Sequence, residues 1–251
     1  MSTLESEFFD LLATSQSRWT RLLIEGRTWT NIVLRNLAWQ AQIDREKANG
    51  VHFAILQRPD SDDGAADHNE VEAEPAEPVE HEEIWSLWVT PERRRARFRV
   101  GDGTVDVVIE GSTFWSNGLG RSFTNGGNSD HGHGQGDGQN LIRTTEYCGL
   151  LHVEELARGM RIGRDTIDAK VTILEDEDPE RGQGVHGLAI GDADYLELSI
   201  DRERGVVLSA SSWIRGDIYR VVEMTKVEFD THFTLDAFKI EPAIGTEWSS
   251  V

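Results

Sequence analysis

The sequence of 251 residues predicts an α+β protein, in which a helical N-terminal block precedes a single antiparallel sheet. Two observations predict this class. Apolar residues near the N-terminus repeat at about 3.6 residues, as in helices that bury one face. From Glu83 onward, short apolar runs alternate with glycine-containing turns at a spacing of about 8 to 12 residues, which is typical of sandwiches and barrels.

The N-terminal segment, residues 1–58, is predicted to be helical. Ser2 or Thr3 can cap the first helix, and Asn49–Gly50 is a stop signal for the last one. The apolar positions that repeat with helical spacing are Leu4, Phe8, Leu11, Leu12, Ile32, Val33, Leu37 and Ile43.

Two low-complexity segments interrupt the chain. Residues 59–83 carry eleven acidic residues without a Lys or Arg, and contain almost no large apolar side chain, so we expect a disordered acidic loop. Residues 124–140 are rich in glycine and polar residues and are expected to form a flexible loop. The sheet is therefore expected within residues 84–251.

Strands and turns are predicted in order along this second part. Tight turns are expected at Gly101–Gly103, at Glu110–Gly111, at Asp201–Gly205 and at Arg215–Asp217. A short helix is expected at His152–Met160. The predicted strands contain residues 84–89, 95–100, 105–108, 113–116, 169–175, 185–190, 195–201, 206–214 and 219–229.

Composition excludes several classes of function. The net charge of −20 opposes attraction to nucleic-acid phosphates and anionic membranes. A single cysteine, Cys148, excludes an intramolecular disulfide and any cage of several thiolates. There is no apolar stretch of about 18 residues, and Met1–Asp10 lacks the basic and apolar regions of a signal peptide, so we expect a soluble, cytoplasmic protein.

Several runs within residues 84–242 follow one another in a recognisable order. WSLWVTPERRRARF is followed by VVIEGSTFWSN, and together these runs resemble the opening hairpins of the LolA/RseB-like family of lipoprotein-carrier proteins. The run YLELSIDRERGVVLSASSWIRGDIYRVVEMTKVEFD, with FTLDAFKIEP after it, is similar to its last hairpins. LLHVEELARGM resembles the helix that plugs the sheet, and the N-terminal block resembles that of a bacterial variant. The resemblance covers about residues 84–242, without the glycine-rich loop.

The resemblance implies a particular fold and binding mode. In this family a curved antiparallel sheet forms a half-open β-barrel. Its concave face is lined by apolar side chains, covered by helices, and provides a pocket for acyl chains. The family therefore implies a hydrophobic or lipid-like ligand for this chain.

Strand alternation selects the candidate cavity residues, because alternate side chains of a curved sheet point inward. The same residues can instead form the core beneath the helices, in which case the barrel is filled. The candidates are Trp85, Leu87, Val89, Val107, Ile109, Phe114, Trp213 and Ile214.

A second candidate site is a ridge of four arginines. Arg93, Arg95, Arg97 and Arg99 alternate along one predicted strand and therefore share one face. Three interpretations of the ridge are open. It can belong to an ordinary solvated edge strand, it can pair with the chain's own acidic loop, or it can bind the phosphate or carboxylate group of an external ligand.

Metal and catalytic chemistry have little support. Asp130, His131, His133 and Asp137 are ligand types that suit zinc or nickel, but a flexible loop with H-x-H spacing is a weak signal, so we predict no metal and no cofactor. Cys148 precedes His152 by four residues, and the intervening glycine argues against a shared helix. No nucleophile-elbow or zinc-protease motif is present.

The sequence thus predicts a non-enzymatic binding protein with a hydrophobic or lipid-like ligand on the concave face. The alternative is a protein-interaction or regulatory module with no small-molecule ligand. A ligand binder has more inward apolar volume than its helices fill. An interaction module exposes Trp29, Trp39 or another aromatic patch on its surface.

Overall fold

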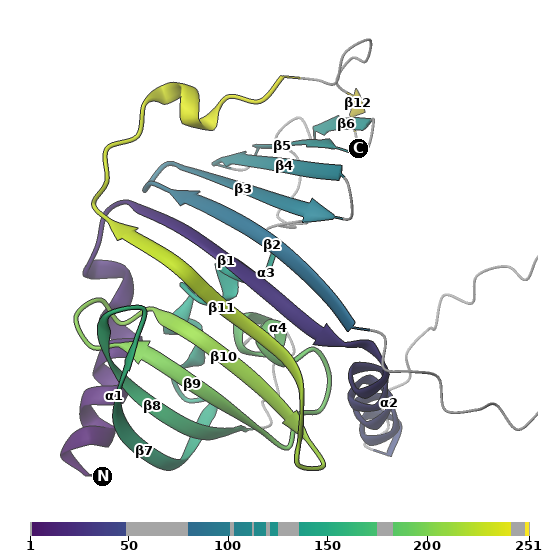
Figure 1. Cartoon of the computed structure of the whole chain (residues 1–251), viewed down its shortest axis with the longest axis vertical. Helices are drawn as coiled ribbons and strands as arrows, with labels where there is room; N and C mark the ends of the chain where they lie inside the picture. Colours follow the sequence, from purple (N-terminus) through teal and green to yellow (C-terminus); the bar gives the residue numbers. More distant parts are fainter. Residues whose placement is uncertain are drawn as a thin grey trace, which may run out of the picture.

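The computed structural model describes residues 2–48, 80–100, 103–111, 113–118, 121–124, 136–174, 183–241 and 249–250. These residues form one large, open sheet with a few short helices, which confirms the α+β class (Figure 1). Most of the two low-complexity segments lies outside the described residues. Where the chain is described, Glu80–Glu83 belong to a strand and Gly136–Asn140 to a helix, so the loop predictions are wrong for these two stretches.

Twelve strands make up the sheet over the described residues, and all neighbours are antiparallel except β12 and β6. Their order is β12-β6-β5-β4-β3-β2-β1-β11-β10-β9-β8-β7. The strands are β1 (Leu22–Asn31), β2 (Glu80–Val89), β3 (Arg93–Val100), β4 (Gly103–Glu110), β5 (Thr113–Gly118), β6 (Arg121–Thr124), β7 (Leu151–Arg161), β8 (Arg164–Ile173), β9 (Tyr195–Asp201), β10 (Val207–Ile214), β11 (Asp217–Phe229) and β12 (Ser249–Ser250).

Short helices connect and cover the strands. Ser2, one of the two capping residues predicted from the sequence, caps the first helix through a capping box with Glu5. The helices are α1 (Thr3–Thr14), η1 (Ser15–Ser17), α2 (Ile32–Ala48), α3 (Gly136–Asn140), η2 (Thr144–Tyr147), α4 (Gln183–Ala189) and η3 (Leu235–Phe238). Among the residues described, no helix combines the length and the apolar character that crossing a membrane requires.

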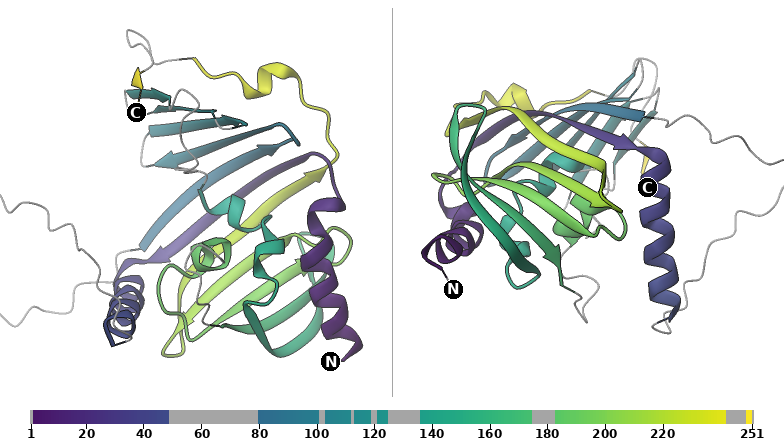
Figure 2. Two further views of the ribbon diagram at one scale, coloured as in Figure 1. Left: turned by 180° about the vertical axis from the view of Figure 1, so that it is seen from behind. Right: turned by 60° about the horizontal axis from the view of Figure 1, so that its bottom comes forward.

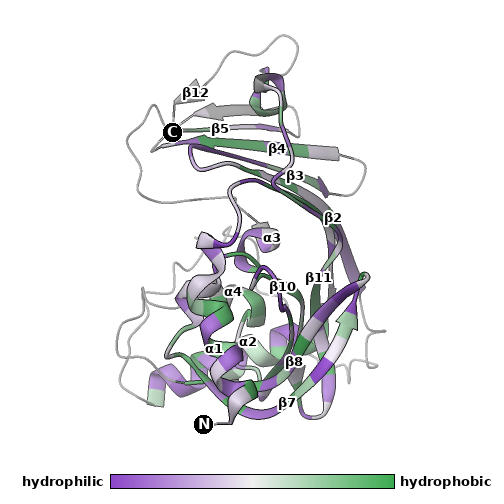
Figure 3. Ribbon diagram, turned by 90° about the vertical axis from the view of Figure 1, so that its left-hand side faces the viewer, coloured by the Kyte–Doolittle hydropathy of each residue, from purple (hydrophilic) through white to green (hydrophobic). Residues whose placement is uncertain are grey.

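The sheet is strongly curved, and the helices α1, α3 and α4 lie against one of its faces (Figures 2 and 3). We call this the inner face and the opposite one the outer face. The main core fills the space between the inner face and these helices. Leu12 of α1, Ile24 of β1, Leu188 of α4 and Leu198 of β9 are all buried members of that core.

The N-terminal block is not wholly helical, which corrects the first prediction. Residues 22–31 form β1, which lies in the middle of the sheet between β2 and β11. Its side chains alternate, with Leu22, Ile24, Thr28 and Thr30 buried. This period of two is the strand signal, and it was masked by helical segments on both sides.

Two further elements differ from their predictions. Residues 152–160 belong to the edge strand β7 rather than to a plug helix, because the segment pairs with β8 in a hairpin. Its sequence is rich in Glu, Leu, Ala and Arg, all strong helix formers, so strand pairing overrides local propensity here. Conversely, the strand predicted at residues 185–190 lies mostly in α4. The strands predicted within β2–β5, β8 and β9–β11 are confirmed, several with shifted ends.

Candidate functional site

Most of the predicted cavity residues share the inner face. Trp85, Leu87, Val89 and Val107 are only 2–4 % exposed and belong to the main core. Ile109 packs partly buried against the same core, and Phe114 opposite it on β5 is half-buried. The chain's own helices therefore cover much of the apolar surface on which the sequence prediction placed a ligand.

The other two predicted cavity residues lie elsewhere. Trp213 stacks on Tyr195, with ring centroids 5.4 Å apart. Ile214 belongs to a second small cluster with Ala38 of α2 and Tyr219 of β11. The structure therefore does not bring Trp213 and Ile214 together with Trp85.

The arginine ridge lies on the outer face and is paired within the sheet. Arg93 contacts Glu110 at 2.8 Å, and Arg95 and Arg97 contact Asp106 at 2.9 and 3.0 Å. Strand β3 lies between β2 and β4, so the interpretation as an edge strand is wrong. The acidic partners described for these three arginines come from β4, directly across the strand pair, and residues 59–79 of the predicted acidic loop lie outside the described residues. Arg99 is exposed.

A segment after β11 crosses the outer face, and we call residues 230–241 the C-terminal strap. Asp230 anchors its start: the backbone N–H and the hydroxyl of Thr20 donate to its Oδ1 at 2.9 and 3.0 Å, and these bonds hold its pKa below the usual value. Further along, the Ala237 carbonyl accepts a hydrogen bond of 2.8 Å from Arg95. The side-chain amide of Asn117 in β5 donates to the Glu241 carbonyl.

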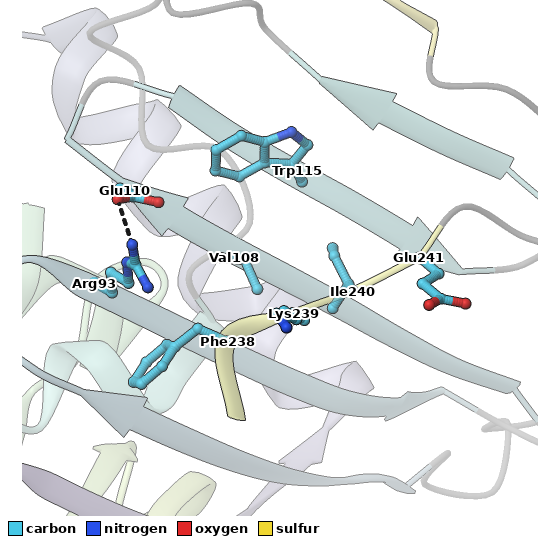
Figure 4. Close-up of a pocket in the computed structure, with 8 residues that line it drawn as sticks. All are labelled: Arg93, Val108, Glu110, Trp115, Phe238, Lys239, Ile240 and Glu241. Atoms are coloured by element: carbon cyan, nitrogen blue, oxygen red, sulfur yellow. Dashed lines mark hydrogen bonds and ion pairs between the residues drawn. The ribbon is translucent and has the colours of Figure 1, made fainter. Parts of the chain in front are cut away.

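Two adjoining grooves lie along the strap on the outer face, with volumes of about 500 and 580 Å³. They share Arg93, Glu110 and Phe238, and we treat them together as the strap groove. Figure 4 shows the first of them, where Phe238 and Ile240 of the strap face β3, β4 and β5. The apolar and aromatic lining residues of both parts are Pro91, Val108, Trp115, Phe233, Phe238 and Ile240.

Nine of the fifteen lining residues of the strap groove are polar or charged, and five of them, Thr20, Arg21, Thr90, Glu92 and Thr234, line only the second part. The Arg93–Glu110 ion pair stands where its two parts meet, and Lys239 and Glu241 line the first part. Phe238 is 8 % exposed and contacts the Phe233 ring edge-on at 5.9 Å between centroids. Apolar and aromatic side chains next to charged groups suit a ligand with a hydrophobic chain and a polar end.

The sequence prediction did not include Val108, Trp115 or Phe238 as site residues. A signal was present for the first two, because Val108 alternates with the outward Asp106 and Glu110. Trp115 lies opposite Val108 in the β4–β5 register and so shares its face. No periodicity marks Phe238, which reaches the site through the course of the strap.

The described residues add no support for the catalytic pair or the metal ligands considered from the sequence. Cys148 follows η2 and His152 lies in β7, so the two do not share a helix. Burial raises the pKa of the Cys148 thiol, which opposes the thiolate form that a nucleophile requires. Asp130, His131 and His133 lie outside the described residues, whereas Asp137 is described and forms an ion pair with Arg220.

Comparisons with known proteins give distant structural similarities. No protein-family model matches the sequence, and no curated protein matches it. The crystal structure of MucB gives a TM-score of 0.46 at 13 % identity, over 96 % of this chain and 64 % of that one. An uncharacterized conserved protein from Thermus thermophilus gives a TM-score of 0.49 at 11 % identity, over 98 % of this chain and 99 % of that one.

A LolA superfamily protein from Nitrosomonas europaea gives a TM-score of 0.33 at 9 % identity, over 96 % of this chain and 99 % of that one. This chain spans less than two thirds of the length of MucB. At such values the resemblance to the LolA/RseB-like family stays a prediction. We therefore base the function on the geometry of the chain itself.

Proposed function

We propose that this protein is a non-enzymatic binding protein that holds a hydrophobic, lipid-like ligand in the strap groove. The chain of the ligand lies along the apolar and aromatic lining, and its polar end lies near Arg93 and Lys239 at the margin. Affinity then comes mainly from apolar burial. The location differs from the concave site that the sequence predicted.

One observation carries this proposal. Apolar side chains on the inner face pack against the chain's own helices, whereas those of the strap groove border a volume of about 500 Å³ in one part and 580 Å³ in the other. Sites for small organic ligands have volumes of roughly 300 to 1,000 Å³ and predominantly apolar walls. The strap groove meets the volume condition, and six of its fifteen lining residues are apolar or aromatic.

Native mass spectrometry of the freshly purified protein, followed by organic extraction, tests whether a ligand is carried. A stoichiometric added mass that leaves on extraction supports the proposal. The groove itself is tested by titration with decyl maltoside, an uncharged single-chain amphiphile, below the concentration at which it forms micelles. Trp115→Ala and Phe238→Ala are expected to weaken its binding by about tenfold or more, a loss of at least about 1.4 kcal/mol.

Trp39→Ala serves as the matched control, because Trp39 is a 52 % exposed aromatic residue on α2, away from the strap groove. It should leave the affinity for decyl maltoside unchanged. Wild-type affinity in both Trp115→Ala and Phe238→Ala would show that the groove is not the binding site.

A protein-interaction module is the second candidate function, and α2 favours it. Trp39 and Val33 are 52 % and 48 % exposed, and Ala38 is the buried residue of this 17-residue helix. Exposed aromatic surface is typical of protein contacts. A native mass equal to that of the protein alone, and unchanged after incubation with amphiphiles, would favour this second function over the first.

A further inference from the structure

Strand β7 is the last strand in the order of the described sheet, at its lower end in Figure 1, so it pairs with β8 on one side only. At 11 residues it is about twice as long as an average strand. A long edge strand presents unpaired backbone N–H and C=O groups, which are a template for pairing with another chain. We call the unpaired side of β7 the free edge.

The backbone groups at the free edge belong to Leu156, Arg158 and Met160. Met160 lies opposite Asp165 of β8, whose carbonyl accepts a hydrogen bond of 3.0 Å from the Arg202 N–H, on the side away from β7. In an antiparallel pair, two opposite residues either bond each other or both point away from each other. The backbone of Met160 therefore points to the free edge, and those of Arg158 and Leu156 do so by alternation.

The free edge is regular and exposed over residues 155–161. The irregularity in the β7–β8 register lies before this stretch, between Val153 and Glu155. Bulges, prolines and lysines commonly protect edge strands, and residues 155–161 contain none of them. Met160 is 72 % exposed, and Ala157 and Arg158 are exposed as well. A second strand therefore has access to this edge.

A second copy of the same strand fits the free edge. Two antiparallel copies related by a two-fold axis use the whole of residues 155–161 when the axis passes beside Arg158. In that register Leu156, Arg158 and Met160 of one copy lie opposite Met160, Arg158 and Leu156 of the other. The free N–H groups of each copy thus meet free carbonyls of the other copy, as in an ordinary antiparallel ladder.

The side chains are largely complementary in the same register. Leu156 of each copy lies beside Met160 of the other on one face, and Glu155 lies beside Arg161 on the opposite face. Apolar pairs and pairs of opposite charge across two strands are both favourable. One contact opposes association, because the two copies of Arg158 face each other across the axis and like charges repel.

Arg161 is held in place before any association. Its guanidinium contacts Glu223 of β11 at 3.0 Å, while its side chain stays 40 % exposed. A guanidinium has five N–H donors, so donors remain for Glu155 of a second copy. A side chain that is already ordered loses less conformational entropy when it binds. The charged pair of the interface is therefore partly preorganised.

We propose that two copies of this chain associate through their free edges and join their sheets into one continuous sheet. Each copy supplies the N–H and C=O groups of Leu156, Arg158 and Met160. The strap groove lies against β3, β4 and β5, on the other side of β1 in the strand order. The association is therefore independent of the proposed function and leaves the strap groove open.

Sedimentation velocity on the full-length protein tests the association. The weight-average mass of wild type should rise from one copy toward two as the concentration is raised from micromolar to millimolar. Arg158→Pro removes the N–H at the centre of the free edge and spares the bonds to β8, so it should weaken association by about tenfold or more. Arg158→Ala removes the repulsion at the axis and should strengthen association by roughly two- to fivefold.

Exchange of charges tests the register. Glu155→Arg places two pairs of positive charges across the interface, and Arg161→Glu places two pairs of negative charges there, so each variant alone should associate about tenfold more weakly than wild type. An equimolar mixture of the two variants should form a mixed dimer with the affinity of wild type, because opposite charges face each other again in both pairs.

Three results would overturn the proposal. They are a wild type that stays a single copy at millimolar concentration, an Arg158→Ala variant that associates more weakly than wild type, and a mixture of folded charge variants that does not associate. If Arg161→Glu does not fold without its contact to Glu223, the two substitutions of Arg158 still decide the matter.

Two controls separate this interface from other surfaces. Trp39→Ala on α2 should leave association unchanged, and a loss of association in this variant would assign the contact to α2 and overturn the proposal. Trp115→Ala should also leave association unchanged, so failure of the β7 interface is distinct from failure of the strap groove.

Discussion

The inner face of the sheet and the strap groove on its outer face both present apolar side chains, yet they differ in what covers them. On the inner face, Leu22 and Ile24 are fully buried and Trp85 is 2 % exposed, beneath helices that come from three parts of the chain. On the outer face, a single strap crosses β3–β5, Trp115 is half-buried, and open volume adjoins it.

Alternation along a strand shows which side chains share a face, but it does not show whether that face becomes core or site. Trp85 shares its face with Leu87 and Val89, and Trp115 shares its face with Thr113 and Asn117, so each strand places an aromatic side chain on one face. The elements that pack on each face decide whether it becomes core or site. Four sets of variants test this contrast.

The largest effect is expected from removing the two tryptophans that represent the two faces. Trp85→Ala should lower the free energy of unfolding by about 3–5 kcal/mol, because it leaves a cavity in a packed core. Trp115→Ala should lower it by less than about 1 kcal/mol, because a half-buried side chain leaves no closed cavity. Urea denaturation measures both. Equal losses would mean that the two faces are packed to the same degree.

A smaller loss in the free energy of unfolding is expected from Gly138→Ala in α3. A Cβ at this position would lie 2.6 Å from the Trp85 ring, so the ring or the helix must move. Overpacking of this kind costs about 1–3 kcal/mol, partly offset by the better helix propensity of alanine. Since the three atoms nearest to that Cβ all belong to the Trp85 ring, the loss should shrink when Gly138→Ala is measured in a Trp85→Leu background. The same loss in both backgrounds would contradict this contact.

The arginine ridge offers a matched pair on the outer face. Arg95 and Arg97 both contact Asp106, but their side chains are 12 % and 48 % exposed. Only Arg95 also holds the strap, through Ala237, and lies over the Trp88 ring at 5.4 Å. Arg95→Gln should cost about 1–2 kcal/mol, and Arg97→Gln less than about 0.5 kcal/mol.

Hydrogen exchange supplies the second measurement for this pair. Arg95→Gln should accelerate exchange of strap amides in residues 237–240, and Arg97→Gln should not. If both variants accelerate exchange equally, Arg95 does not fasten the strap through Ala237.

The smallest effect is expected at Glu83. Burial, and after it the negative charge of Asp137, raise the pKa of Glu83 above its ordinary value of 4.5. The charges of His81 and Arg220 lower this pKa by smaller amounts. Because the folded state favours the protonated form, ionised Glu83 destabilises it as the pH rises above 4.5. Glu83→Gln should therefore be more stable than wild type at pH 7, by less than about 1 kcal/mol. That advantage should disappear below pH 4.5; an advantage that grows toward low pH would contradict the raised pKa.

Much of the sheet was predictable from the sequence, because its signals are local. Turns such as Arg215–Gly216 mark the end of one strand and the start of the next, and β9 has the predicted bounds. Strand β1 was missed because two helices flank it, and β7 because its residues favour a helix in isolation. In both cases pairing with a distant or neighbouring strand decides the structure, and a single sequence does not show that pairing.

The site was harder to predict than the fold. Strand alternation put Trp85, Leu87 and Val89 on one face, but it contained no information on the helices that would cover them. The course of the strap depends on contacts between residues far apart in the sequence, such as Asp230 with Thr20 and Ala237 with Arg95. Contacts of this kind follow from the whole fold rather than from any local pattern.

Fluorine NMR of protein labelled with 5-fluorotryptophan tests whether the ligand binds in the strap groove, because it reports on both faces of the sheet in one titration. The variants Trp85→Phe and Trp115→Phe identify the two resonances. On addition of decyl maltoside below its micelle concentration, the Trp115 resonance should shift and saturate, and the Trp85 resonance should stay in place. A saturable shift of Trp85 with Trp115 unchanged would mean that the ligand enters the inner face, and would contradict the assignment of the strap groove as the binding site.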